Sequence, residues 1–281
     1  MSSQYKTLGP ITYIPPLPSS PSPPPSKKAT KIPTIICLHG FDSSSLEYRR
    51  LHPLLSTHYP TYCADIKGWG FTDLSGSNAA ATKTETMVEF VKSVCEQDGL
   101  EVENVIMCGA SLGATVAMEV TLSLGLTRMI VLDGQCFVDG VGPTPPKPLL
   151  GLGVRVLKSK WLRKIANKIS YKDDRLGNDD AVEIGCMHTR REGWEVATID
   201  FINSGGFYPS KSVPRVKANV ATLVVWGEDD EVLPRGDRGK FTEEMGAEVV
   251  GIEECGHVPH LEQPKRTVEV IKGWIESYED V

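Results

Sequence analysis

Short runs of apolar residues recur along the chain and are separated by longer segments in which apolar positions follow a helical spacing. Uninterrupted runs of this kind are typical of strands buried on both faces of a parallel sheet. Between two of these runs, residues 84–95 place Met87, Val88, Val91 and Val94 on one side, which predicts a helix that covers the sheet. The alternation therefore predicts an α/β fold with a mostly parallel central sheet flanked by helices. The predicted strands lie at residues 33–38, 62–64, 105–108, 128–133, 221–226 and 248–252.

The first thirty residues follow a different pattern. Residues 5–14 alternate weakly, which predicts an edge strand, and residues 15–30 are rich in proline, which removes backbone donors and fixes φ. We expect the second stretch to be a loop of polyproline type, with a PxxP ligand for a partner protein as the alternative.

The strand pattern breaks between residues 140 and 219, where prolines and helical segments replace it. This predicts a core in two parts, 1–139 and 220–281, with a helical cap inserted at 140–219. A helix is expected over residues 153–169. Its apolar stripe is Val154, Leu157, Trp161, Ile165 and Ile169, and its other surface carries Arg155, Lys158, Lys160, Arg163, Lys164 and Lys168. The basic surface is either a solvated face or an attractant for an anionic, lipid-like substrate or an anionic membrane.

Composition narrows the class of partner. The chain has 281 residues, 40% of them hydrophobic, and a formal net charge of -6, which argues against a general nucleic-acid binder and favours a small-molecule substrate. Seven cysteines without a C-x-x-C pair argue against a disulfide framework or a zinc site. Without a secretory signal or a run of eighteen apolar residues, we expect a cytoplasmic protein, with a plastid location as the alternative.

The candidate chemistry centres on residues 104–125. An apolar strand at 105–108 runs into Gly109-Ala110-Ser111-Leu112-Gly113, which satisfies G-x-S-x-G, and a helical pattern follows. Strand, tight turn and helix form the context that a nucleophile elbow requires, and small residues on both sides of the serine let strand and helix approach. This predicts that Ser111 is a nucleophile presented at the edge of the sheet.

Backbone donors for an oxyanion are expected next to this serine. The strand at 33–38 ends in His39-Gly40-Phe41, where this architecture places half of an oxyanion hole, so the predicted donors are the N–H groups of Phe41 and Leu112. We interpret His39 as a structural residue that fixes this loop. Asp65 precedes Ser111 in the chain and is expected to fix a loop by side-chain hydrogen bonds.

A serine hydroxyl is a poor nucleophile at neutral pH, so it needs a base, and a histidine base needs a carboxylate to hold its tautomer. His257 follows the last predicted strand, and acidic residues follow the strand before it. His260 lies three positions after His257, but no further ligand completes a metal set, so it is expected to be a packing or entrance residue.

Five segments in this order, HGF, DIKGWGFTD, GASLG, WGEDDEVLP and CGHVPHLEQP, resemble the α/β-hydrolase superfamily from Pro33 to the end of the chain. The sequences of these segments are most similar to those of cap-bearing hydrolases of plants and photosynthetic microbes. The resemblance implies that Ser111 is the nucleophile, Asp230 the acid and His257 the base. Asp133, which ends a strand where some relatives place the acid, is the alternative to Asp230.

The resemblance implies a serine hydrolase that cleaves a carboxylic ester or related acyl compound through an acyl-enzyme, with no cofactor or metal. A serine at position 111 argues against haloalkane dehalogenases and epoxide hydrolases, which use an aspartate there. Carbon–carbon bond hydrolases stay open, although their elbow commonly has a second glycine where this chain has Ala114. A slow-turnover ligand receptor that keeps the triad is the rival from another functional class.

Overall fold

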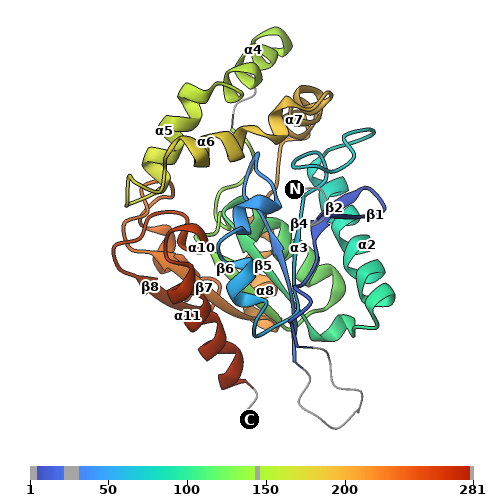
Figure 1. Cartoon of the computed structure of the whole chain (residues 1–281), viewed down its shortest axis with the longest axis vertical. Helices are drawn as coiled ribbons and strands as arrows, with labels where there is room; N and C mark the ends of the chain where they lie inside the picture. Colours follow the sequence, from blue (N-terminus) through green and yellow to red (C-terminus); the bar gives the residue numbers. More distant parts are fainter. Residues whose placement is uncertain (1–4, 22–31, 143–145, 279–281) are drawn as a thin grey trace.

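The computed structural model describes residues 5–21, 32–142 and 146–278, which form one eight-stranded sheet (Figure 1). The strand order is β1-β2-β4-β3-β5-β6-β7-β8, with β3 to β8 parallel and the β1–β2 and β2–β4 pairs antiparallel. The predicted fold class is confirmed. The strands are β1 (Lys6–Leu8), β2 (Ile11–Ile14), β3 (Thr34–Leu38), β4 (Thr61–Ala64), β5 (Val105–Ala110), β6 (Arg128–Leu132), β7 (Ala221–Gly227) and β8 (Glu248–Ile252).

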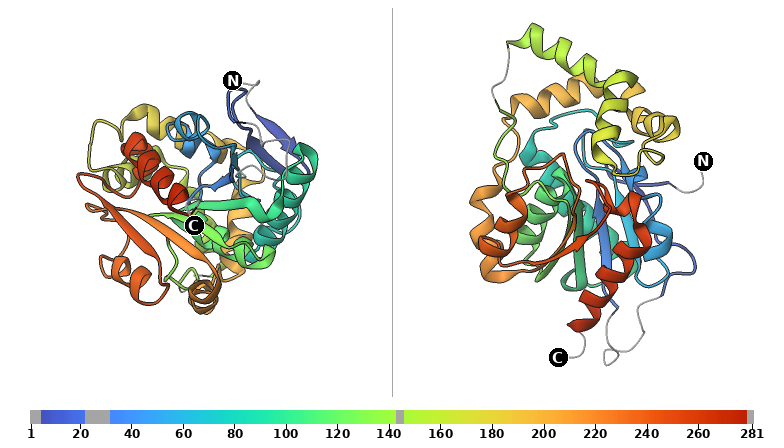
Figure 2. Two further views of the ribbon diagram at one scale, coloured as in Figure 1. Left: turned by 90° about the horizontal axis from the view of Figure 1, so that it is seen from below. Right: turned by 90° about the vertical axis from the view of Figure 1, so that its left-hand side faces the viewer.

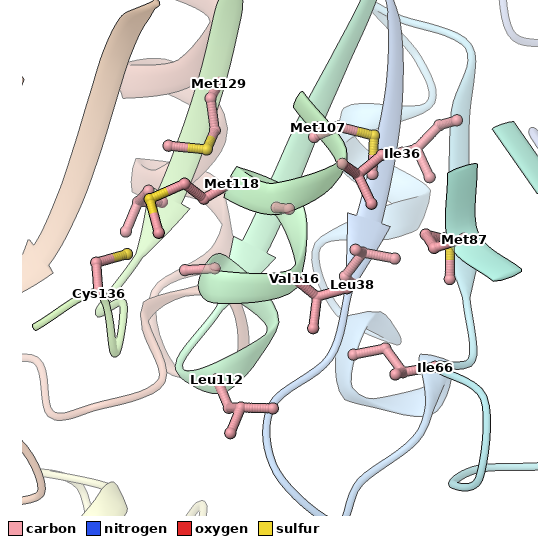
Figure 3. Packing of buried hydrophobic residues seen from close by; sticks show 14 of the residues in the cluster. Ile36, Leu38, Ile66, Met87, Met107, Leu112, Val116, Met118, Met129 and Cys136 are labelled. Carbon is pink, nitrogen blue, oxygen red and sulfur yellow. The ribbon is translucent and has the colours of Figure 1, made fainter. Parts of the chain in front are cut away.

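The two faces of the sheet bury two separate cores because side chains alternate along each strand. On β3, Ile36 and Leu38 join the core under α2, α3, α8 and α9, whereas Ile35 and Cys37 join the core under α1 and α11. Figure 3 shows part of the first core, with Ile36 adjoining Met107 and Leu38 facing Val116. The covering helices are α2 (Ala80–Asp98), α3 (Leu112–Leu124), α8 (Val213–Asn219), α9 (Asp237–Glu243), α1 (His52–Leu55) and α11 (Pro264–Ser277).

Between β6 and β7 the chain forms α4 (Lys147–Leu157), α5 (Lys160–Ser170), α6 (Asp179–Cys186), η3 (His188–Arg190) and α7 (Trp194–Asn203). We call α4, α5, α6 and α7 the cap helices. They lie together at one end of the molecule, and α11 points towards the opposite end (Figures 1 and 2). The division of the chain into core and cap at 139/140 and 219/220 stays a prediction.

The predicted continuous helix over 153–169 is wrong. The chain leaves the helical path after α4, and the Ser159 hydroxyl accepts a hydrogen bond from the Leu162 N–H at 3.3 Å, so Ser159 caps a second helix, α5. A serine at this position competes with helix continuation because its side chain satisfies a backbone donor of the following turn.

The single edge strand predicted at 5–14 is instead a hairpin of β1 and β2, turned at Gly9 with φ 57°. A left-handed φ of this kind costs glycine little, which is why the turn forms there. Most of the predicted proline-rich loop, residues 22–31, lies outside the described residues. The remaining short helices are η1 (Ser45–Tyr48), η2 (Val102–Asn104), η4 (Pro209–Lys211) and α10 (Pro259–Glu262).

All seven cysteines are buried and unpaired, as expected of core residues. None of the helices in the described part of the chain combines the length and the apolar character that crossing a bilayer requires.

Candidate active site

The turn between β5 and α3 confirms the predicted sequence of strand, sharp turn and helix. Ser111 has φ 50° and ψ -122°, a left-handed backbone that a residue with a side chain rarely adopts. A Cβ at Gly109 would lie 2.3 Å from the Gly113 carbonyl oxygen, and a Cβ at Gly113 would lie 2.3 Å from the Leu38 carbonyl oxygen. The two glycines are therefore required by close backbone contacts, and the serine between them is held in a strained conformation.

Ser111 and His257 line one cavity of about 220 Å³. Its walls come from the loop after β3, the elbow, the loop after β8 and two of the cap helices, α5 and α6. The cap helices thus cover the site that the predicted nucleophile and base share. The polar side chains of the wall include Glu47, Arg49 and Asn167.

Asp230 holds His257 through a hydrogen bond of 2.9 Å between the Asp230 Oδ2 and the His257 Nδ1. Asp230 Oδ1 accepts from the backbone N–H groups of Val232 at 2.6 Å and Leu233 at 3.2 Å. Burial alone would raise the pKa of Asp230, but the bond and charge of His257, together with these two amides, lower it overall. An ionised Asp230 fixes the His257 tautomer with its proton on Nδ1, which leaves Nε2 free to accept a proton.

Asp133, the alternative acid, lies beside this pair, and Asp133, Asp230 and His257 each offer an atom within 4.8 Å of the others. The Asp133 carboxyl accepts from the Gly227 N–H at 2.9 Å. Burial, followed by the charge of Asp230, raises the pKa of Asp133 well above its usual range. If Asp133 is neutral and Asp230 is ionised, one proton on Asp133 removes the repulsion between the two carboxyl groups. The pair therefore needs no metal ion to balance its charge.

The loop after β3 is fixed from both sides. The buried His39 imidazole bonds the Gly40 carbonyl through Nδ1 at 2.8 Å and accepts from the Ile66 N–H through Nε2 at 3.0 Å. The interpretation of His39 as a structural residue is confirmed. The Ser111 N–H donates to the Leu132 carbonyl, and the Gly40 N–H donates to the Glu47 carboxylate. Within the described residues, no acceptor pairs with the N–H groups of Phe41 and Leu112, the predicted oxyanion donors.

Two other motif residues have the structural roles expected of them. Asp65 accepts from the backbone N–H groups of Ser45 at 2.5 Å and Phe71 at 2.7 Å, which fixes the loop after β4. His260 is buried and bonds Glu47 through Nε2 at 3.1 Å. His260 is therefore a packing residue at the wall of the cavity, as predicted.

Glu47 was not predicted from the sequence. Its carboxylate accepts from the Gly40 N–H at 3.2 Å and contacts His260, so it fixes the residue before Phe41. Burial would raise the pKa of Glu47, but the hydrogen bond and charge of His260 outweigh burial and lower the pKa to about 2. No local pattern marks this role, since Glu47 lies in a short stretch after HGF that also carries Asp42, Arg49 and Arg50.

Asp42 was also missed. It has φ 47° and is buried, and its carboxylate accepts from three cap residues: His188 at 2.9 Å, Trp194 at 2.8 Å and Arg163 at 2.5 Å. These donors lie 121 to 152 positions further along the chain. Asp42 follows Phe41 directly, so the cap helices are bonded to the loop that carries a predicted oxyanion donor.

Residues 35–270 match the model of the alpha/beta hydrolase family. The chain belongs to this family. It is 33% identical over 246 residues to the alpha/beta hydrolase domain-containing protein VTE7 of Arabidopsis thaliana, covering 84% of this chain and 72% of that protein. It is 24% identical over 220 residues to a 2-hydroxy-6-oxononadienedioate/2-hydroxy-6-oxononatrienedioate hydrolase of Cupriavidus pinatubonensis, covering 72% of each. Among solved hydrolase structures, a serine hydrolase involved in carbazole degradation aligns with a TM-score of 0.72 at 20% identity, covering 95% of this chain and 94% of that one.

Proposed function

We propose that this hydrolase cleaves a carboxylic ester or related acyl compound through an acyl-enzyme on Ser111. One observation carries the proposal: Ser111 is held at a left-handed elbow and shares a cavity with His257, whose Nδ1 is bonded to Asp230. Nucleophile, base and orienting carboxylate are the three groups that acyl transfer to a hydroxyl needs.

In the proposed reaction, His257 Nε2 takes the Ser111 hydroxyl proton as the oxygen attacks the substrate carbonyl carbon. Asp230 stabilises the imidazolium that forms and keeps its orientation. The same proton then passes to the leaving alcohol, which departs and leaves the acyl group on Ser111. Water, activated by His257 in turn, releases the acid and restores the hydroxyl.

The negative charge on the carbonyl oxygen would be met by the N–H groups of Phe41 and Leu112. Donors of this kind act only if they are held in place, since their value lies in not having to reorganise during the reaction. His39 and Glu47 both hold Gly40, and Asp42 holds the other side of Phe41, which supports a preorganised loop.

The test is labelling by a fluorophosphonate probe combined with turnover of esters of graded acyl length. The parent protein is expected to be labelled and to turn over at least one ester. Ser111→Ala is expected to lose both without loss of the fold, because a small side chain fits the elbow. Ester turnover that persists in Ser111→Ala would contradict the proposal. Labelling of Ser111 without turnover of any ester would instead favour a ligand receptor.

Hydrolysis of a carbon–carbon bond is the second candidate, and the cavity gives a reason to test it. Arg49 lines the cavity, and so does Asn167, whose Nδ2 has no hydrogen-bond partner among the described residues. A guanidinium and an amide donor suit a carboxylated substrate. The relative from Cupriavidus pinatubonensis is named for dicarboxylates of this kind.

To compare the candidates, a 2-hydroxy-6-oxo-dienoate and a neutral aryl ester can be assayed with the parent protein and with Arg49→Gln. If carbon–carbon hydrolysis is the activity, the dienoate is turned over faster than the ester, and Arg49→Gln raises KM for the dienoate alone. Turnover of the ester without turnover of the dienoate rules this candidate out.

A further inference from the structure

Helix α5 turns its polar side towards the cavity and its apolar side towards solvent, the reverse of the usual arrangement of an amphipathic helix. Its residues Arg163, Asn167 and Ser170 line the cavity of Ser111. Its apolar residues Trp161, Ile165 and Ile169 face solvent, with exposed fractions of 70%, 37% and 41%. These three are spaced by four positions and so form one stripe on the outer surface. The apolar stripe of α5 therefore faces outwards, beside the exposed side chains of Lys164 and Lys168.

Helix α4 carries apolar residues on both sides. Leu150 and Val154 are buried and pack with Trp194 of α7. On the other side, Leu149, Leu152 and Val156 are exposed by 58%, 61% and 45%. A helix that is apolar all round normally lies inside a protein, yet α4 is the outermost of the cap helices (Figures 1 and 2). Its outer side therefore has apolar surface that water covers poorly.

The same two helices are basic. Residues 148–170 contain six lysines and arginines and no acidic residue. Several of these side chains pair with acidic residues of neighbouring helices, such as Lys164 with Asp179 and Lys158 with Glu195. Even so, residues 140–219 contain 14 basic and 8 acidic residues, whereas the rest of the chain contains 16 basic and 28 acidic residues. Positive charge is therefore concentrated in the cap, and the rest of the chain is net negative.

We infer that the outer sides of α4 and α5 dock on an anionic lipid bilayer. We call the docking surface the outer cap face and define it as Leu149, Leu152, Val156, Trp161, Lys164, Ile165, Lys168 and Ile169. Its apolar side chains enter the boundary between headgroups and acyl chains, and its lysines meet lipid phosphates. The acidic remainder of the chain is repelled by the same surface, so the molecule binds in one orientation, with α5 between the bilayer and the cavity. This inference does not depend on the proposed reaction.

Charge favours a bilayer over a second copy of this chain as the occupant. A symmetric dimer through the outer cap face would bring the lysines of both copies together, with like charges facing each other. An anionic bilayer offers hydrocarbon to the apolar side chains and, in the headgroup layer directly above it, phosphate to the lysines.

Trp161 makes the test direct. Of the five tryptophans, Trp161 is the exposed one, whereas Trp69, Trp194, Trp226 and Trp274 are buried. The full chain is mixed with vesicles of phosphatidylcholine alone or of phosphatidylcholine and phosphatidylglycerol in equal amounts. With the anionic vesicles, we expect co-sedimentation, a blue shift of the fluorescence and loss of acrylamide quenching. We expect the binding to weaken as salt is raised.

Two pairs of variants separate the contributions. Trp161→Ser combined with Ile165→Ser is expected to weaken partitioning into anionic vesicles by about tenfold or more, because two apolar side chains no longer enter the bilayer. Tyr278→Ser is the control and should leave binding unchanged, since this exposed aromatic residue directly follows α11, the helix that points away from the cap helices (Figure 1). Lys164→Gln combined with Lys168→Gln is expected to lower the affinity for anionic vesicles about fivefold per lysine at low salt. Lys92→Gln, at an exposed position on α2, is the control and should leave this affinity unchanged.

Three results would overturn the inference: no sedimentation of the parent with anionic vesicles, equal binding by Trp161→Ser/Ile165→Ser, or a shift of Trp161 that phosphatidylcholine alone produces as strongly. A concentration-dependent dimer seen by ultracentrifugation, lost in Trp161→Ser/Ile165→Ser and unaffected by vesicles, would assign the face to a second copy instead. Ser111→Ala should bind vesicles like the parent, so a failure of the proposed reaction and a failure of docking are distinguishable.

Discussion

Asp133 and Asp230 lie side by side next to His257, and their surroundings shift the two pKa values in opposite directions. Burial raises the pKa of Asp133, and the charge of Asp230 raises it further, whereas the bond to His257 lowers the pKa of Asp230. A proton on Asp133 lets two carboxyl groups share the interior with a single negative charge, which stays on the group that contacts the histidine.

The two asparagine variants should therefore differ. Asparagine has the shape and neutrality of a protonated Asp133, and its oxygen can still accept from the Gly227 N–H, so Asp133→Asn should keep kcat within about threefold of the parent. Asp230→Asn removes the charge that stabilises the imidazolium and should lower kcat by about a thousandfold or more. Steady-state kinetics on one ester decides. Full activity in Asp230→Asn with a dead Asp133→Asn would reverse the assignment of the acid.

Strain at the elbow gives a prediction about stability. Ser111→Ala keeps a side chain at φ 50°, whereas Ser111→Gly relieves the left-handed conformation, against a smaller entropic cost of glycine in the unfolded chain. A net gain of about 1 kcal/mol corresponds to a Tm about 2–4 °C higher for Ser111→Gly than for Ser111→Ala. Both variants lack the Ser111 hydroxyl, so thermal unfolding compares them on equal terms. Equal Tm values would show that the turn stores no strain.

Glu47 should make stability depend on acid pH. Its pKa is lowered from 4.5 to about 2 in the folded protein, so its contribution is present above pH 4.5 and is lost as pH falls towards 2. A depression of this size corresponds to about 3 kcal/mol. Glu47→Gln should lower the free energy of unfolding at pH 7 by about 2–3 kcal/mol and flatten its decline between pH 5 and 2. Urea unfolding at a series of pH values measures both, with the exposed Glu89→Gln as the control.

Asp42 should link the cap helices to the reaction. In Asp42→Asn one acceptor oxygen becomes an amide donor that faces the Arg163, His188 or Trp194 donor, so at least one of the three bonds is lost. We expect kcat to fall by about tenfold or more through displacement of Phe41, with a smaller change in KM. The control is Asp139→Asn. Asp139 is an exposed residue whose carboxylate accepts a hydrogen bond from the Ser210 hydroxyl, and it does not line the cavity. Equal kcat values in the two variants would show that Asp42 does not influence the reaction.

The strands, the elbow and the loop functions of His39 and Asp65 were predictable because local signals determine them: an apolar run, a G-x-S-x-G turn, a polar residue after a strand. The orientation of α5 was not, because helical spacing identifies an apolar side without saying which side meets the protein. The cavity beneath α5 takes its polar side, which no local pattern records.

The roles of Asp42 and Glu47 lay beyond the sequence for a different reason. Glu47 acts on Gly40, seven positions away, and on His260, more than two hundred positions away, while Asp42 binds donors from three cap elements. Neither residue belongs to a spacing motif, and each becomes meaningful only when distant segments are brought together.

The hairpin of β1 and β2 has a practical consequence for how the protein is produced. β2 pairs with β4 at Tyr13 and Ala64, and the Thr12 carbonyl accepts from the Asp65 N–H at 2.9 Å. Trimming the chain beyond residue 14 would turn β4 into a bare edge strand, the kind of edge that recruits other chains into aggregates. It would also free the segment that holds Asp65. Expression tags and cleavage sites are therefore best placed ahead of Lys6, and truncated forms that begin after Ile14 are expected to precipitate.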